Sequence, residues 1–469
     1  MVISCAHVYP FSILIKKLFG TDGIRGEAGT FPLDAATIEI VGASLAAHLK
    51  AKLGSAPLIV IGRDTRESGE WIEQALVAGA SRAGAKLRTA GVITTPGIAF
   101  LARTLPADAG VVISASHNAY RDNGIKIFAP SGRKLDDATE RLIEGDVFSG
   151  RDSPVTTADN RSFKEFQVRN EHHELRTRYL EFLTDEIAHD LSLDGLRLVL
   201  DCANGASSDI APELFHELGA IVTTLNNTPD GRNINLGCGS LHTETLQNEV
   251  IKQDADIGVA FDGDADRALF IDAKGRLVNG DATLWVLANA LKARQQLNSN
   301  TVVATVMSNI GLELAFQSQG IRLIRTDVGD KYVLEELMRL GASLGGEQSG
   351  HIIFPSLSLA GDGMITTLCM LRTMTEAGKA LHELTDGFHT FPQILVNVEV
   401  KGKRPFLEIP SIQDSARQIE AVLGSRGRLL LRYSGTESLA RVMIEGESQD
   451  DIEKHAKELA GVIQKELGV

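Results

Sequence analysis

The stretch Val111-Val112-Ile113-Ser114-Ala115-Ser116-His117-Asn118 joins an apolar run to a polar loop. The run has the length and β-branched composition of a buried strand, so the loop after it is held on a rigid support. A serine beside a histidine in such a loop is a candidate hydroxyl nucleophile. A serine at a strand end can also be a helix cap or a turn residue, so the function of Ser116 depends on its neighbours.

A second apolar run, Val259–Phe261, ends in the acidic loop D-G-D-A-D-R at Asp262–Arg267. Three carboxylates at alternate positions repel one another unless a cation relieves them, and their hard oxygens suit Mg²⁺. The loop lacks the glycine and the glutamate that an EF-hand calcium loop requires. A phosphate on the serine could supply one more oxygen. The predicted ligands of this Mg²⁺ site are Ser116, Asp262, Asp264 and Asp266.

Length, charge and cysteine content limit the classes of protein to which this chain can belong. A chain of 469 residues exceeds the roughly 250–300 residues at which one core stops growing, so several domains are expected. The net charge of −14 argues against nucleic-acid binding, which needs cationic contacts to phosphates. Four scattered cysteines without a C-x-x-C pair fit a reducing cytoplasm. The chain has no apolar run of about 18 residues, so we expect no membrane span.

Predicted strands and helices alternate along most of the chain, which is typical of α/β domains. The apolar run of residues 1–15 precedes the pair Lys16-Lys17, the reverse of a signal peptide, so we do not expect secretion and treat these residues as an N-terminal extension. The acidic loop would follow a strand, where open α/β sheets bind ligands. The last unit is smaller and reads as a lid. The predicted units are 16–165, 166–266, 267–386 and 387–469.

Basic side chains occur in three glycine-containing loops and in a fourth loop near the C-terminus. Arg25 lies in G-T-D-G-I-R-G, Arg63 and Arg66 lie in G-R-D-T-R, and Lys126 lies in N-G-I-K. Such groups can offset the charge of a transferring phosphoryl group, although each could instead form a surface salt bridge. Arg432 begins R-Y-S-G-T-E-S, which suits a phosphate monoester or, alternatively, an ordinary hairpin turn.

The loop G-G-E-Q-S-G-H at Gly345–His351 combines a carboxylate, an amide and a hydroxyl with little bulk. Its glycines allow a ligand to approach the backbone closely, so these groups match the hydroxyls of a sugar. His117 and His351 are candidates for proton transfer, although either could be a packed histidine with a satisfied hydrogen bond.

In this order along the chain, the loops resemble those of the α-D-phosphohexomutase superfamily, especially its bacterial members that act on glucosamine phosphates. The resemblance covers nearly the whole chain. It implies three similar mixed-sheet α/β domains plus a smaller α+β C-terminal domain around a central cleft. The motifs that carry it are G-T-D-G-I-R-G at Gly20–Gly26, S-A-S-H-N at Ser114–Asn118, D-G-D-A-D-R at Asp262–Arg267 and G-E-Q-S-G-H at Gly346–His351.

The resemblance also implies roles for individual residues. Ser116 would be the phosphorylated serine. Arg25, His117 and Lys126 would serve the reacting phosphate and its proton, with the general base open between the histidine and the lysine. Gln348 is typical of the glucosamine enzymes, whereas phosphomannomutase and phosphoglucomutase relatives tend to carry methionine. The substrate-binding residues implied are Arg267, Asp327, Lys331, Glu347, Ser349, His351, Arg432, Ser434, Gly435 and Thr436.

The activity that the resemblance implies is an intramolecular phosphotransfer between glucosamine 6-phosphate and glucosamine 1-phosphate. It would proceed through a phosphoserine enzyme with one Mg²⁺ per active site and a sugar 1,6-bisphosphate as intermediate and activator. The product would feed amino-sugar nucleotide and cell-wall precursor synthesis in the cytoplasm. The partner is a small amino-sugar phosphate, and a homodimer is compatible with this reading.

Three alternatives stay open at this point. The same mechanism could act on mannose or glucose phosphates. Asp262 could be the covalent nucleophile of a haloacid-dehalogenase-like phosphatase, because D-x-D after an apolar strand marks that class. The chain could also be a catalytically inactive sugar-phosphate binding protein. Acyl transfer by an α/β-hydrolase has little support, because no G-x-S-x-G elbow surrounds Ser116.

Overall fold

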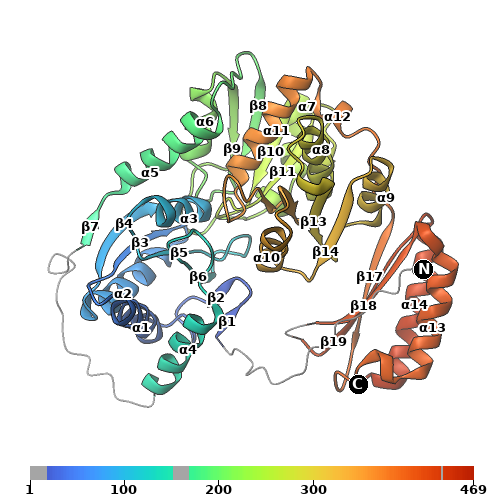
Figure 1. Cartoon of the computed structure of the whole chain (residues 1–469), viewed down its shortest axis with the longest axis horizontal. Coiled ribbons are helices and arrows are strands. Elements are labelled where there is room, and N and C mark those ends of the chain that lie inside the picture. Colours follow the sequence, from blue (N-terminus) through green and yellow to red (C-terminus); the bar gives the residue numbers. More distant parts are fainter. Residues whose placement is uncertain (1–17, 152–167, 435–436) are drawn as a thin grey trace.

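The computed structural model describes residues 18–151, 168–434 and 437–469 (Figure 1). The predicted extension at residues 1–15 and the two phosphate-loop residues Gly435 and Thr436 lie outside the described residues. Across the described parts, four sheets follow one another along the chain. No helix in these parts is long and apolar enough to cross a membrane.

The first sheet has seven strands in the order β1-β2-β6-β5-β3-β4-β7. Strands β3, β4, β5 and β7 run parallel, whereas β6 is antiparallel to both β5 and β2. The strands are β1 Phe19–Gly20, β2 Gly23–Glu27, β3 Leu58–Arg63, β4 Lys86–Val92, β5 Ala109–Ile113, β6 Asp122–Phe128 and β7 Val168–Asn170. The helices are α1 Ala35–Leu53, α2 Gly69–Arg82, α3 Thr95–Thr104 and α4 Asp137–Arg151.

The second sheet has five strands in the order β12-β11-β10-β8-β9. Because β11 pairs antiparallel with β10, this sheet continues past residue 266, where we expected the unit to end. The first sheet likewise takes β7 from beyond residue 165. The strands are β8 Arg197–Asp201, β9 Ile221–Leu225, β10 Ile257–Phe261, β11 Ala268–Asp272 and β12 Leu277–Val278. The helices are α5 His172–Glu181, the π-helical Phe182–Ile187, α6 Ile210–Glu217 and α7 Glu244–Lys252.

The third sheet has four strands in the order β14-β13-β15-β16. Three of them, β13, β14 and β15, are parallel, and β16 is antiparallel to β15. The strands are β13 Thr301–Thr305, β14 Arg322–Thr326, β15 Leu344–Gly346 and β16 Ile352–Ile353. The helices are α8 Gly280–Ala293, α9 Ile310–Ser318, α10 Asp330–Leu340, α11 Gly363–Ala377 and α12 Leu381–Leu384.

The C-terminal unit is a smaller antiparallel sheet in the order β17-β19-β18. Its two long helices, α13 Pro410–Leu423 and α14 Gln449–Leu467, lie on the outer side of the sheet (Figure 1). The strands are β17 Gln393–Glu399, β18 Arg428–Tyr433 and β19 Leu439–Glu445. Together the four sheets confirm the predicted architecture of three α/β domains and a smaller α+β domain.

One apolar cluster extends across the first three domains, beside smaller clusters within each of them, while the C-terminal domain has its own. A single cluster of buried side chains joins Phe100 of α3 and Tyr179 of α5 to Phe261 of β10 and Trp285 of α8. The ring centroids of Phe100 and Phe182 lie 4.4 Å apart. A separate cluster, which includes Ile412 and Leu459, fills the C-terminal domain. The apolar packing therefore holds the first three domains together as one block.

Buried polar groups attach the C-terminal domain to the third domain. The Asn309 amide donates to the carbonyl of Phe391 at 3.0 Å and to the Glu445 carboxylate at 3.3 Å. Glu445 also accepts from the Arg428 guanidinium at 2.8 Å, and that guanidinium donates to the carbonyl of Ser308 at 3.0 Å. Such a buried network is stable only while every member keeps its partner.

Asp281 of α8 supports this attachment, because its carboxylate accepts from the Asn309 backbone N–H at 2.8 Å. Burial raises the pKa of Asp281 from 3.8 to about 6, more than its hydrogen bonds to Asn309 and Ser308 lower it. The folded protein thus binds a proton on this group more tightly than the unfolded chain does.

We predict that Asp281→Asn removes part of the pH dependence of stability. A raised carboxyl pKa costs the fold nothing below about pH 4 and about 3 kcal/mol above about pH 6. The melting temperature should therefore fall less between pH 4 and pH 7 in the variant than in the parent, as measured by calorimetry. Identical pH profiles for the two proteins would show that Asp281 does not titrate in this range.

Candidate active site

Ser116 lies just after β5, and its backbone is in the left-handed region with φ of 52°. Its side chain is buried at 1% exposure. The Ser116 N–H donates to the Ser114 hydroxyl at 3.0 Å, and that hydroxyl donates to Asp64 at 2.6 Å. A left-handed conformation is uncommon for a residue with a side chain and persists only where its surroundings fix it. The loop is therefore held in one conformation by buried hydrogen bonds.

The carbonyls of this loop are held from behind by Arg66. Its guanidinium donates to the carbonyls of Ser116 and Asn118 at 2.9 Å each and to that of Ala119 at 2.5 Å. It also pairs with Asp64 at 2.9 Å and is fully buried. Of the two roles expected for Arg66, the geometry favours the salt bridge over a phosphoryl contact, because loop carbonyls and the Asp64 carboxylate already occupy the guanidinium. Arg63 pairs with Glu73 at 3.1 Å.

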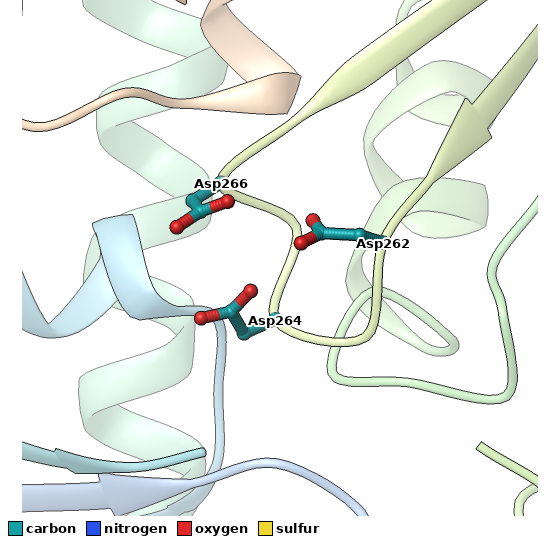
Figure 2. A group of neighbouring side chains, drawn as sticks. All are labelled: Asp262, Asp264 and Asp266. Atoms are coloured by element: carbon teal, nitrogen blue, oxygen red, sulfur yellow. The ribbon is translucent and has the colours of Figure 1, made fainter. Parts of the chain in front are cut away.

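The predicted nucleophile and the acidic loop meet across the boundary between the first two domains. The Ser116 hydroxyl donates to the Asp262 carboxylate at 2.5 Å. Asp262, Asp264 and Asp266 are all buried and each offers an oxygen within 4.8 Å of the others. Figure 2 shows the three side chains converging from one loop, with Asp262 directly after β10. The sequence-predicted metal ligands are therefore brought together.

The chemistry of the acidic loop fits a divalent metal ion. One oxygen of Asp264 and one of Asp266 are buried without a hydrogen-bond partner among the described residues. Burial, and then repulsion by Asp266 and Asp264, raises the pKa of Asp262 well above its usual range. A hard cation would give the free oxygens a partner and relieve the repulsion.

Lys126 of β6 supplies the positive charge closest to the acidic loop. Its ammonium lies 2.9 Å from Asp264, 3.3 Å from Asp266 and 3.2 Å from Asp22. Burial favours the neutral amine, but attraction to these three carboxylates outweighs it and raises the pKa of Lys126 well above normal. Lys126 is therefore a buried ammonium, able to donate hydrogen bonds to a phosphoryl oxygen.

His117 has the opposite electrostatic surroundings. Its Nδ1 lies 3.3 Å from the Ser116 hydroxyl. Burial, with further contributions from Arg267 and Arg25, lowers the pKa of His117 to about 4. A neutral imidazole at this distance can accept a proton, so the structure gives His117 and Lys126 different protonation states rather than equivalent ones.

A cleft of about 520 Å³ opens beside these groups, between the first and third domains. Arg25 and Arg267 line it, and each has a buried Nε without a hydrogen-bond partner within the described ranges. Glu347 and His351 of the predicted sugar loop line the same cleft. The cleft thus combines guanidinium donors suited to phosphate with a carboxylate suited to sugar hydroxyls.

His351 is fixed by carboxylates rather than left as a free base. Its Nδ1 lies 3.5 Å from Asp266 and its Nε2 lies 3.8 Å from Asp330. Burial opposes protonation, yet these carboxylates raise the pKa of His351 to about 9. At neutral pH His351 is therefore an imidazolium and adds positive charge to the cleft. Its neighbour Ser349 donates to Glu347 at 3.4 Å.

Some predicted residues do not line the cleft. Asp327 is exposed, and Lys331 instead lines a second cavity of about 490 Å³ and pairs with Asp137. A guanidinium nitrogen of Arg432 lies 4.0 Å from the Met307 sulfur. Ser434 is buried within the C-terminal domain, and its hydroxyl donates to Glu437 at 3.2 Å. Arg432 and Ser434, the described residues of the predicted phosphate loop, therefore do not line the cleft.

Two residues of the site were missed by sequence reasoning. Lys134 pairs with Asp22 at 2.7 Å and with Asp330 at 2.7 Å, which links the first domain to the third beside the cleft. Asp22 lies inside the quoted G-T-D-G-I-R-G motif, so its carboxylate could have been recognised as a partner for Lys126. No motif surrounds Lys134, and only the fold reveals its position.

Family models match four consecutive parts of the chain. Phosphoglucomutase/phosphomannomutase α/β/α domains I, II and III match residues 16–153, 177–275 and 279–391, and the C-terminal domain of that family matches 395–462. The chain belongs to the phosphoglucomutase/phosphomannomutase family. It is accordingly an enzyme, a phosphohexomutase of the isomerase class.

Similar sequences extend over the full length. A phosphoglucosamine mutase of Solibacter usitatus is 51% identical and aligns over 97% of this chain and 100% of its own. One from Syntrophus aciditrophicus is 46% identical over 96% and 100% of the two chains. The fold matches a family protein of Burkholderia thailandensis with a TM-score of 0.77, 23% identity, and coverage of 97% of this chain and 100% of that one.

A more distant solved structure was determined with ligands. It is the N-acetylphosphoglucosamine mutase of Aspergillus fumigatus in complex with GlcNAc-6P and magnesium, with a TM-score of 0.63 and 18% identity. The match covers 96% of this chain and 95% of that one. At this identity the likeness shows a shared fold.

We predict that MgCl₂ stabilises the parent protein through the acidic loop. At 100 times Kd, binding to the folded state alone would add about 2.7 kcal/mol, seen as a rise in melting temperature. Binding should weaken as the pH falls, because Asp262 must lose its proton and its pKa is raised.

Asp264→Asn should lose most of the MgCl₂-induced rise in melting temperature. The exposed Asp190→Asn serves as control, and equal responses of the two variants would contradict the assignment.

Proposed function

We propose that this enzyme interconverts glucosamine 6-phosphate and glucosamine 1-phosphate through a phosphorylated Ser116. The observation that carries the proposal is the 2.5 Å hydrogen bond between Ser116 and Asp262, which sets a buried hydroxyl against a cluster of carboxylates. The choice of sugar is supported by relatives named phosphoglucosamine mutase that are 51% and 46% identical over their whole length.

The reaction balances without an external phosphate donor. The phosphoryl group of phospho-Ser116 passes to the 1-hydroxyl of glucosamine 6-phosphate: the bond to the 1-oxygen forms as the bond to the serine oxygen breaks, and the proton lost by the sugar hydroxyl balances the proton taken up by the released serine oxygen. The resulting 1,6-bisphosphate turns over and returns its 6-phosphoryl group to Ser116. The net change is an isomerisation, and the same bisphosphate can prime an unphosphorylated enzyme.

Asp262, Asp264 and Asp266 would hold Mg²⁺, which when bound would neutralise charge on the phosphoryl oxygens. The Lys126 ammonium would contact the transferring group, and so would the guanidinium groups of Arg25 and Arg267, whose Nε atoms have no hydrogen-bond partner among the described residues. We assign the hydroxyl proton to the pair His117 and Lys126. Their different protonation states favour the histidine as acceptor in the structure as it stands.

The sugar would be oriented by the loop at Gly346–His351. The Glu347 carboxylate accepts from the Gly329 N–H at 2.9 Å, which fixes it toward the cleft, and Ser349 lies beside it. Asp327 and Lys331 flank the loop that carries Gly329, and we assign them to the substrate of the closed enzyme.

The C-terminal domain would hold the phosphate that does not react. Arg432 and Ser434 would grip it, together with Gly435 and Thr436. Since the first two lie outside the cleft, this role requires the C-terminal domain to move toward the first three domains. Closure of this kind excludes water that would otherwise hydrolyse the phosphoserine.

We further assign the enzyme to the cytoplasm, where its product would feed amino-sugar nucleotide and cell-wall precursor synthesis. Cys202, Cys238 and Cys369 carry free thiols, which supports a reducing compartment. A homodimer is the quaternary structure we propose, to be checked by light scattering.

Ser116→Ala should lower mutase activity by several orders of magnitude, because the nucleophile is lost. The melting temperature should stay close to that of the parent, because only one buried hydroxyl is removed. Intact-protein mass spectrometry should show one phosphoryl group on the parent and none on the variant. Hydroxylamine should leave that group in place, since it cleaves an aspartyl phosphate but not phosphoserine. Cleavage would instead favour a phosphatase that uses Asp262.

The parent should give a higher kcat/KM on glucosamine 6-phosphate than on glucose or mannose 6-phosphate. Gln348→Met should reduce this preference by about 10- to 100-fold, because the amide that could contact the amino group is lost. A coupled assay with all three sugars measures the ratio. If Gln348→Met leaves the ratio unchanged, the residue does not select the sugar.

A further inference from the structure

The carbonyl oxygens of Ser116 and Asn118 are each shared by the same two donors. Arg66 of the first domain donates to both at 2.9 Å. The Asn235 side-chain amide, from the loop after β9 in the second domain, donates to the Ser116 carbonyl at 2.9 Å and to the Asn118 carbonyl at 3.0 Å. We call these four hydrogen bonds the carbonyl clamp. It grips the nucleophile loop from two domains at once.

The Asn235 half of the clamp comes from the domain that also carries the acidic loop. Gly263 of that loop packs so closely on the nucleophile loop that a Cβ there would lie 2.6 Å from the Ser116 carbonyl oxygen and 2.8 Å from the Asn235 amide nitrogen. The clamp and the acidic loop therefore meet Ser116 side by side. Asn235 thus couples the direction of the Ser116 side chain to the position of Asp262.

Asn235 is itself well anchored for this task. Its backbone N–H donates to the Ala203 carbonyl at 2.9 Å, and its neighbour Ile234 is buried. Its φ of 57° lies in the left-handed region, which asparagine, aspartate and glycine tolerate better than other residues. The side chain can therefore be changed among these three types without straining the loop.

We propose that Asn235 is a positioning residue for phosphoryl transfer, holding Ser116 in line with the metal-binding carboxylates through the carbonyl clamp. The proposal rests on Ser116 being the proposed nucleophile. Asn235 touches neither the cleft nor the acidic side chains, so its effect falls on the orientation of the loop rather than on substrate binding. Arg66 alone would leave the carbonyls of Ser116 and Asn118 held by the first domain only.

The test compares Asn235→Asp with Thr65→Val. Asn235→Asp keeps the left-handed backbone and the side-chain shape but replaces the amide donor with a carboxylate that faces two carbonyl oxygens. Thr65→Val is the matched control, because it removes one hydrogen bond across the same domain boundary, from the Thr65 hydroxyl to the Asn204 carbonyl at 2.6 Å, without touching the nucleophile loop. Asn235→Gly removes the amide without adding charge.

The measurement is the rate at which Ser116 is phosphorylated by glucose 1,6-bisphosphate and then discharged by glucosamine 6-phosphate, followed by intact-protein mass spectrometry. We expect both Asn235 variants to lose about 100-fold in these rates and in kcat, as for a misplacement of about 1 Å, with KM unchanged. Thr65→Val should keep the parent rates at a similar loss of melting temperature. Parent rates in Asn235→Asp, or equal losses in Thr65→Val, would overturn the proposal.

A second readout separates the clamp from the proposed function. Hydrogen exchange of the amides at Ser114–Asn118 needs no turnover, and it should be faster in Asn235→Asp than in Thr65→Val. If the parent never carries phosphate on Ser116, the proposed function fails, and exchange alone then decides whether the clamp orders the loop. Equal protection in the two variants would overturn the clamp in either case.

Discussion

A hydroxyl of one domain and a carboxylate of another meet at 2.5 Å, and the rest of the architecture serves that meeting of Ser116 with Asp262. Three buried carboxylates in one loop repel one another, so the surrounding structure has to supply positive charge. Lys126 of β6 and the imidazolium of His351 provide it from outside the loop, and Arg267 provides it from the end of the loop itself. The apolar core shared by the first three domains keeps these elements in register.

The parts of the site that follow buried strands could be predicted from the sequence. Ser116 comes three residues after the end of the wholly buried β5, and Asp262 comes directly after the wholly buried β10. Loops at the carboxyl ends of strands carry the ligand-binding side chains of open α/β sheets. A polar residue that follows an apolar strand pattern can therefore be recognised as a candidate site residue. The alternation of strands and helices likewise predicted three α/β domains and a distinct C-terminal domain.

Two kinds of feature could not be predicted from the sequence: the direction in which a side chain points, and contacts between residues far apart in the chain. A sequence shows the charge of Arg66 but not that its guanidinium points into the back of the nucleophile loop. Lys134 and Asn235 act across domain boundaries, and nothing near them in the chain marks their partners. The second sheet extends beyond residue 266, because β11 returns to pair with β10, and nothing in the acidic motif marks that return.

The separate core of the C-terminal domain makes this enzyme modular in an evolutionary sense. Its polar attachment through Asn309, Glu445 and Arg428 lies far along the chain from the nucleophile loop. Mutations on the surface of α13 or α14 can therefore change the stability of this domain while the apolar core that joins the first three domains stays intact. Selection for a new growth temperature can therefore act on this domain without changing the buried groups around Ser116.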